Sequence, residues 1–215
     1  MSPETTSTDP VLDDLNPDQL AAVTHESGPL LILAGAGSGK TRAITRRIAW
    51  LVRSRAVHPG RILAVTFTNK ASEEMRGRVA ALLGGGDAPR WMGTFHSVCL
   101  RLLRMHADRL GYDRGFVVYD DDDQESLLRR ILKKEGRQKE GPRAFASYID
   151  LWKNEGLLEP PEAVRPRERR LAEVFRTYQA ELKAASAMDF GDLLCQALRL
   201  LRDNADLRDH YQDQY

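Results

Sequence analysis

Apolar positions in the first half of the chain alternate between short continuous runs and runs with helical spacing. Leu30 to Leu33 and Ile62 to Phe67 are continuous apolar or strand-forming runs, which predict buried strands. After each strand, apolar residues recur every three or four positions, which predicts a helix. Strands that alternate with helices in this way predict an α/β fold with a parallel, doubly wound sheet. The pattern predicts strands at 30–33, 62–67 and 91–94, and helices at 16–24, 40–52, 71–83 and 95–110.

The pattern changes after Gly111. One apolar run, Phe116 to Tyr119, leads into a long region of predicted helices, proline-containing turns and basic residues. Its clearest helix is predicted at 167–185, where five apolar residues share one face at helical spacing. This second region is therefore predicted to be a mainly helical insertion. The shared face consists of Leu171, Val174, Phe175, Tyr178 and Leu182.

The composition is that of an ordinary globular protein. The 215 residues include 32 Lys+Arg and 31 Asp+Glu, a formal charge of +1, with 42% hydrophobic residues. No apolar run approaches the roughly 20 residues that cross a bilayer, so we expect no membrane partner. The polar residues 1–13 are predicted to form a flexible tail. Cys99 and Cys195 lie far apart without metal-ligand spacing, which fits a reducing cytoplasm.

Charge is uneven along the chain. Residues 129–143 include seven basic and two acidic side chains, a local net charge of +5. A phosphate-bearing partner can dock on such a run, and a solvated surface is the alternative interpretation. The acidic run Asp120 to Asp123 precedes it and is predicted to begin a helix, because carboxylates favour helix N-termini.

A glycine-rich segment follows the first predicted strand and opens the next helix. Glycines let successive backbone N–H groups converge on phosphate oxygens. Lys40 can then reach the β- and γ-phosphates, and the Thr41 hydroxyl can ligate Mg²⁺. The sequence predicts a phosphate loop for ATP or GTP with Mg²⁺, and a glycine-rich turn with an exposed lysine is the alternative. The segment is Ala34, Gly35, Ala36, Gly37, Ser38, Gly39, Lys40 and Thr41, with alanine at the first position where the motif usually has glycine.

Such an enzyme also needs a carboxylate for the metal at the end of a neighbouring strand. The chain contains no Asp-Glu dipeptide, and Asp120 is the only candidate that follows an apolar run. Because three more aspartates follow Asp120, we interpret it as a helix cap rather than a metal ligand. Thr41 is therefore the only metal ligand that the sequence predicts.

Taken in order, four segments resemble motifs of the UvrD/PcrA/Rep group of superfamily 1 DNA helicases, over roughly residues 15–215. Residues 15–19 resemble the Q motif, in which the glutamine reads adenine, and the loop with Arg42 resembles motif I, including its initial alanine. Residues 66–71 resemble motif Ia and 93–97 resemble motif Ib. The resemblance implies that Gln19 and Arg42 join the loop in binding ATP. Gln19 can also complete a capping box with Asn16.

The two later motifs in such helicases lie along the path of single-stranded DNA. A strand-end aromatic such as Phe67 or Phe95 is placed to stack on a base, and burial in the core is the alternative. Thr68 or Asn69, and likewise Thr94 or Ser97, can instead cap the helices that follow, and His96 can be a buried histidine. The DNA contacts that the resemblance implies are Thr66, Phe67, Thr68, Asn69, Lys70, Thr94, Phe95, His96 and Ser97.

The resemblance also implies a domain organisation. Residues 14–115 form the first part of a RecA-like domain 1A, 116–186 form the helical insertion 1B, and 187–215 return to domain 1A. The Asp-Glu metal motif and a second motor domain with arginine fingers are expected beyond this sequence, so the chain alone is expected to be inactive. Asp189 and Asp192 fall in a segment similar to one in the family, with Gly191 replacing an acidic residue, and they are assigned no chemistry.

By resemblance, the parent protein is an ATP-dependent 3′–5′ DNA helicase that moves on single strands, opens duplex and acts in DNA repair. Its expected partners are single-stranded DNA, single-strand/duplex junctions and DNA-repair proteins, in the nucleoid-associated cytoplasm. Two alternatives come from other classes of protein. One is a nucleotide-dependent DNA-binding module without motor activity, and the other is a small P-loop kinase, which the motif Ia and Ib segments disfavour.

Overall fold

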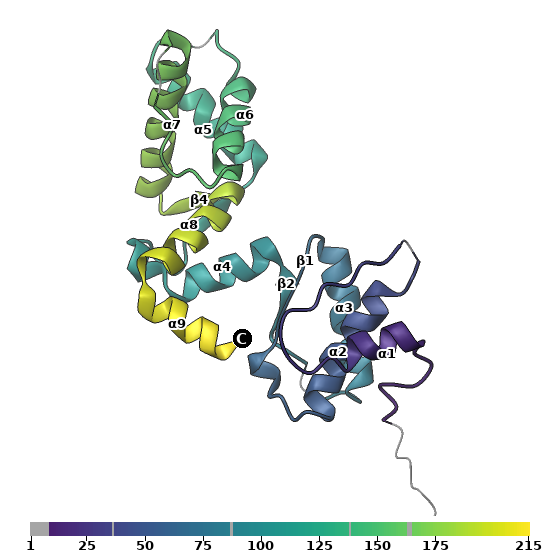
Figure 1. Ribbon diagram of the computed structural model, residues 1–215. Helices are drawn as coiled ribbons and strands as arrows, with labels where there is room; N and C mark the ends of the chain where they lie inside the picture. Colours follow the sequence, from purple (N-terminus) through teal and green to yellow (C-terminus); the bar gives the residue numbers. More distant parts are fainter. Residues whose placement is uncertain (1–8, 36, 87, 138, 163–164) are drawn as a thin grey trace, which may run out of the picture. The chain divides into compact units, whose positions relative to one another are not determined.

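The computed structural model describes residues 9–35, 37–86, 88–137, 139–162 and 165–215, and it divides into two compact units. The first unit extends to Thr94 and includes Gln214–Tyr215, and the second is Phe95–Asp213. Figure 1 shows both units.

The first unit is a mixed α/β body with parallel strands. Its elements are α1 (Pro17–Val23), α2 (Lys40–Arg53), the 3₁₀ turn η1 (Pro59–Arg61), β1 (Leu63–Thr66), α3 (Asn69–Leu82) and β2 (Trp91–Thr94). β1 and β2 pair in parallel, with Leu63 opposite Trp91 and Thr66 opposite Thr94. The strands predicted at 62–67 and 91–94 are therefore confirmed, as is the helix between them. A buried cluster joins α2, α3 and β2 and consists of Ile48, Ile62, Met75, Val79 and Met92.

The strand predicted at 30–33 is wrong for this structure. The segment has no regular secondary structure, and Leu31 and Leu33 are 80% and 85% exposed. A strand exists only where a neighbour completes its backbone hydrogen bonds. Among the described residues, the sheet of this unit contains β1 and β2 alone, so no strand pairs with the run.

Residues 9–13 are part of the folded unit rather than of a tail, which corrects part of the prediction for 1–13. Val11 is 1% exposed and packs in a cluster with Val23, Ala43, Ala49 and Trp50. Arg46 of α2 donates hydrogen bonds to the carbonyls of Pro10 (3.0 Å) and Val11 (2.6 Å). These contacts fix the segment because they bury an apolar side chain and satisfy its backbone. Residues 1–8 lie outside the described residues.

The second unit is mainly helical. Its elements are α4 (Phe95–Met105), η2 (Ala107–Leu110), β3 (Val117–Tyr119), α5 (Asp121–Lys134), α6 (Pro142–Asn154), α7 (Pro166–Ala184), β4 (Ala187–Asp189), α8 (Phe190–Asp203) and α9 (Ala205–Gln214). The predicted apolar face of α7 is confirmed, because all five of its residues are buried in the core that α5, α6 and α7 share. A parallel pair, β3 with β4, places Tyr119 opposite Asp189.

The two units do not coincide with the predicted domain boundaries. The structural division falls between Thr94 and Phe95, whereas the sequence placed it after residue 115 and again after 186. The reason is that α8 packs against α4, so residues 95–110 and 190–203 lie in one body. The assignment of these segments to domains 1A and 1B stays a prediction.

Candidate functional site

The glycine-rich segment forms a tight loop at the N-terminus of α2. Gly37 and Gly39 have φ angles of +76° and +87°, in the left-handed region that glycine enters without steric cost. Lys40 folds back over this loop, and its Nζ donates hydrogen bonds to the carbonyls of Ala34 (2.7 Å) and Gly35 (2.6 Å). A phosphate in the loop would therefore meet an ammonium held by two neutral oxygens, which an anion displaces readily. Ala36 lies outside the described residues.

Gln19 lies against this loop although 19 residues separate it from Ser38. Its Nε2 donates to the Ser38 carbonyl at 3.1 Å, and a Cβ added to Gly39 would come within 2.6 Å of that nitrogen. Only glycine at position 39 therefore allows this close approach. The same side chain completes the predicted capping box, because its Oε1 accepts from the Asn16 N–H at 3.3 Å. The capping role is confirmed, and the adenine-reading role stays a prediction.

A cavity of about 250 Å³ lies beside the loop. Ile32, Leu33 and Ala22 give it apolar surface, while Gln19 and Lys40 present polar groups. Asn16, Asp18 and Ser38 add further polar groups, so the lining is mixed and places apolar surface for an organic ring beside groups that can fix its orientation. The predicted ligand Arg42 donates to the Asp14 carbonyl at 2.9 Å, so it holds the segment before α1.

Thr41 is exposed on the first turn of α2, next to Lys40. The part of the chain that the structure describes contains no group of three or more His, Cys, Asp or Glu side chains that could hold a metal ion. Mg²⁺ usually retains several waters and takes its remaining ligands from phosphates and one or two carboxylates. The Thr41 hydroxyl fits one such position when a nucleotide fills the loop.

The segment that resembles motif Ia leaves the end of β1 with its aromatic side chain outward. Phe67 is 91% exposed, so the core alternative for this residue is excluded. Thr68 accepts the Ala71 N–H at 3.2 Å as the N-cap of α3, and Thr66 donates to the Thr68 carbonyl at 3.1 Å. Asn69 and Lys70 follow as exposed residues of the first helical turn. Both threonines thus shape the turn that presents Phe67.

The segment that resembles motif Ib spans the end of β2 and the start of α4. Thr94 is buried at 8% exposure, whereas Phe95 is 44% exposed at the beginning of the helix. His96 is half-buried, and its ring meets the edge of Phe190 at a centroid distance of 6.0 Å. Ser97 is exposed. The structure therefore leaves Phe95 and Ser97 accessible, and it makes Thr94 part of the fold.

The acidic and basic runs both have structural partners. Asp120 is the N-cap of α5 and forms a reciprocal capping box with Asp123, as predicted. Arg130 and Lys134 of α5 reach Glu181 of α7 at 3.4 and 2.9 Å. Arg129 and Arg143 both contact Glu125, at 2.6 and 3.2 Å. Much of the +5 charge is therefore neutralised locally, which favours the solvated-surface interpretation.

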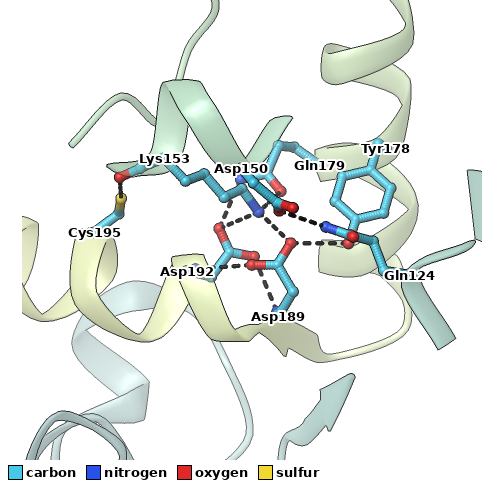
Figure 2. Close-up of polar contacts among 8 residues, drawn as sticks. All are labelled: Gln124, Asp150, Lys153, Tyr178, Gln179, Asp189, Asp192 and Cys195. Carbon is cyan, nitrogen blue, oxygen red and sulfur yellow. Dashed lines mark hydrogen bonds and ion pairs between the residues drawn. The ribbon is translucent and has the colours of Figure 1, made fainter. Parts of the chain in front are cut away.

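Asp189 and Asp192 lie in a buried ion network that sequence reasoning missed (Figure 2). The side chain of Lys153 has no exposed surface, and its Nζ lies 2.6 Å from Asp189 and 2.8 Å from Asp192. Tyr178 donates to Asp189 at 2.8 Å, and Gln179 donates to Asp192 at 3.0 Å. Two carboxylates thus share one ammonium and two neutral donors, a set that joins α6, α7, β4 and α8.

Burial sets the protonation behaviour of this network. It raises the pKa of Asp192, and Lys153 opposes that rise while the neighbouring Asp189 adds to it. Burial also raises the pKa of the Cys195 thiol to about 11, and this thiol donates to the Lys153 carbonyl at 3.1 Å. Cys195 is therefore a protonated structural residue rather than a nucleophile.

Comparison with known proteins identifies relatives of most of the chain. Residues 15–215 match the model of the family described as UvrD/REP helicase N-terminal domain. The chain is 42% identical over 211 residues to the ATP-dependent DNA helicase PcrA of Staphylococcus aureus, covering 95% of this chain and 29% of that protein. It is also 42% identical over 217 residues to the ATP-dependent DNA helicase UvrD1 of Mycobacterium bovis, covering 96% of this chain and 28% of that protein. The chain thus spans less than a third of the length of these relatives. None of the described helices is long and apolar enough to cross a membrane.

Proposed function

This chain belongs to the UvrD/REP helicase N-terminal domain family, and from that premise we propose that it supplies the nucleotide-binding and strand-binding surfaces of an ATP-dependent DNA helicase. The convergence of Gln19 and Lys40 on one glycine loop carries the proposal. A base reader and a phosphate-binding ammonium that line one cavity match the two chemical parts of a nucleotide.

In this proposal Gln19, the glycine-rich loop and Arg42 each have one role in binding ATP. Gln19 hydrogen-bonds the adenine edge, and the N–H groups of residues 34–39 with the α2 N-terminus bind the phosphates. Lys40 neutralises charge on the β- and γ-phosphates, and Thr41 holds Mg²⁺, which supplies further positive charge to the transferred phosphoryl group when bound. Arg42 supports the loop from its contact with the segment before α1.

The strand-binding surface of the proposal has two parts. In the first unit, Phe67 stacks on a base while Asn69 and Lys70 contact the strand backbone. In the second unit, Phe95, His96 and Ser97 contact the strand. Stacking and phosphate contacts do not depend on base identity, which suits a motor that moves along DNA of any sequence. Movement in the 3′–5′ direction, opening of duplex at a junction, a role with DNA-repair proteins and a nucleoid-associated location in the cytoplasm belong to this same proposal.

A second candidate is a nucleotide-dependent DNA-binding module without motor activity. It is favoured by one observation, the absence of an Asp-Glu dipeptide from this sequence. For the same reason we propose that the 215-residue chain alone does not turn over ATP. DNA-stimulated ATPase activity in the intact protein that carries this chain separates a motor from a switch.

Lys40→Ala tests the nucleotide site directly. We expect it to lower the DNA-stimulated kcat by on the order of 10²–10³-fold or more, because it removes a charge aimed at the reacting phosphates. Arg55→Ala is the matched control, since it removes an exposed cation of the same unit that pairs with Glu26. Equal ATPase rates for wild type and Lys40→Ala in folded proteins would rule out the phosphate-loop assignment.

A further inference from the structure

A basic groove runs along α4 in the second unit. It has a volume of about 390 Å³ and is lined by Ser97, Leu100, Arg101, Arg104, Met105 and Arg114. None of these side chains is a carboxylate. The groove therefore combines three guanidinium groups with an apolar floor.

The cations come from two elements. Ser97, Arg101 and Arg104 stand at positions i, i+4 and i+7, which places them on one face over about 10 Å of helix axis. Arg114 belongs to the loop between η2 and β3 and adds a third cation to the lining. All three arginines are exposed. Arg104 is oriented by the ring of Phe116, whose centroid lies 5.8 Å from its guanidinium carbon.

Two of these arginines, Arg104 and Arg114, differ in their pairing from other cations of the unit. Arg109, between Arg104 and Arg114 in sequence, forms a 2.7 Å ion pair with Asp206. By contrast, no described carboxylate lies within ion-pair distance of Arg104 or Arg114. A groove that collects guanidinium groups without acids attracts an anion, and planar guanidinium groups suit bidentate contacts with phosphate oxygens.

We propose that this groove binds the phosphate backbone of single-stranded DNA, with Arg104 of α4 and Arg114 of the loop before β3 as contacts beyond Ser97. The inference rests on the proposed function, because it extends the strand path that begins at Phe95 to Ser97. The apolar floor favours a strand over a small free anion: Leu100 and the 48% exposed Met105 offer surface to sugars and bases. The residues of the groove lie outside the segments that resemble helicase motifs, Ser97 excepted.

The test is binding of fluorescent oligo(dT) to the intact protein, measured by anisotropy over a series of salt concentrations. Arg104→Ala/Arg114→Ala should weaken binding on the order of tenfold at low salt. It should also reduce the slope of log affinity against log salt by about 0.7 for each phosphate that the variant no longer neutralises. Arg176→Ala is the control, because it removes an exposed arginine of α7 in the same unit. It should leave both quantities unchanged.

Two further measurements test the proposal if the Arg104→Ala/Arg114→Ala variant folds poorly. Arg114→Glu leaves the Arg104–Phe116 contact intact and should also weaken binding. Photocrosslinking of iodinated oligonucleotide should label Met105. If wild type binds no DNA, the proposed function fails and the inference with it. If wild type binds and the arginine variants bind equally, with no label at Met105, only the groove assignment is overturned. Loss of a protein partner with unchanged DNA binding would likewise overturn it.

Discussion

Replacing Lys153 with methionine should show how much the buried ion network contributes to the free energy of unfolding of the second unit. The substitution keeps the length and apolar stem of the side chain but removes the ammonium. Asp189 and Asp192, at 4% and 1% exposure, then lose their shared positive partner. The neutral donors Tyr178 and Gln179 remain, as do the capping contacts between the two aspartates.

Removing one partner of a buried ion pair typically costs about 3–5 kcal/mol, because it leaves a buried charge uncompensated. The remaining donors keep both carboxylates hydrogen-bonded, so we expect a loss of about 3 kcal/mol, the lower end of that range. Lys134→Met is the matched control. Its ion pair with Glu181 is partly exposed at 63% and 31%, and such pairs contribute about 0–1 kcal/mol.

The loss should depend on pH in a defined direction. Burial already raises the pKa of Asp192 above its ordinary value, and Lys153 limits the rise. Without the ammonium this pKa rises further, so the folded variant favours the protonated acid. A group whose pKa is higher in the folded state than in the unfolded state stabilises the fold at pH values below its unfolded-state pKa. This stabilisation is lost as the pH rises through the folded-state pKa. The variant should therefore lose less stability near pH 5 than near pH 8.

Urea unfolding measures this effect in the second unit if Trp152 is the only tryptophan. Trp50→Phe and Trp91→Phe remove the other two, and Trp152 reports the core through its 5.4 Å ring contact with Phe175. Adding Asp192→Asn to Lys153→Met should recover part of the loss, since it removes one uncompensated charge. A loss below about 1 kcal/mol, constant from pH 5 to 8, would refute the electrostatic reasoning.

Two further predictions concern binding and turnover. Phe67→Ala should weaken single-stranded DNA binding by roughly 1–3 kcal/mol without changing nucleotide affinity in the absence of DNA, because Phe67 is 91% exposed and carries no core role. Leu198→Ala, which removes another exposed apolar side chain, is the control for the anisotropy and nucleotide titrations. An unchanged DNA affinity for Phe67→Ala would show that Phe67 does not contact the strand. The purified 215-residue chain should show no DNA-stimulated ATPase with Mg²⁺ and saturating strand, because its sequence contains no Asp-Glu dipeptide to hold the metal and orient the attacking water. Robust turnover would show that Asp120 or another acid acts as a metal ligand despite its capping contacts.

The features that the sequence predicted well are those that local interactions determine. Asp120 caps α5, Asn16 and Gln19 form a capping box, and the apolar face of α7 is buried, all within one helix or its first turn. The strand predicted at 30–33 failed for the opposite reason, because strand formation depends on a pairing neighbour that sequence pattern does not supply.

The ion network was missed because its members are distant in sequence. Lys153 and Asp189 are 36 positions apart, and the Asp189–Asp192 spacing predicts only a helix cap. One signal was present. Lys153 continues the stripe of Phe145 and Ile149 at positions i+8 and i+4, so a lysine occupies an apolar face. A charge in that position requires a buried partner, which makes the two unassigned aspartates the natural candidates.

Charge density along the chain was likewise a poor guide to the anion-binding surface. The run 129–143 has the highest local charge, yet five of its cations, Arg129, Arg130, Lys134, Arg137 and Arg143, meet Glu125, Glu135 or Glu181. The groove of α4 has fewer arginines, separated by three and ten positions, and no described carboxylate lines it. Because an ion-paired cation offers an external phosphate little net potential, the pairing of charges in space decides where a strand binds. The salt dependence of DNA binding should therefore follow Arg104 and Arg114 rather than the denser basic run.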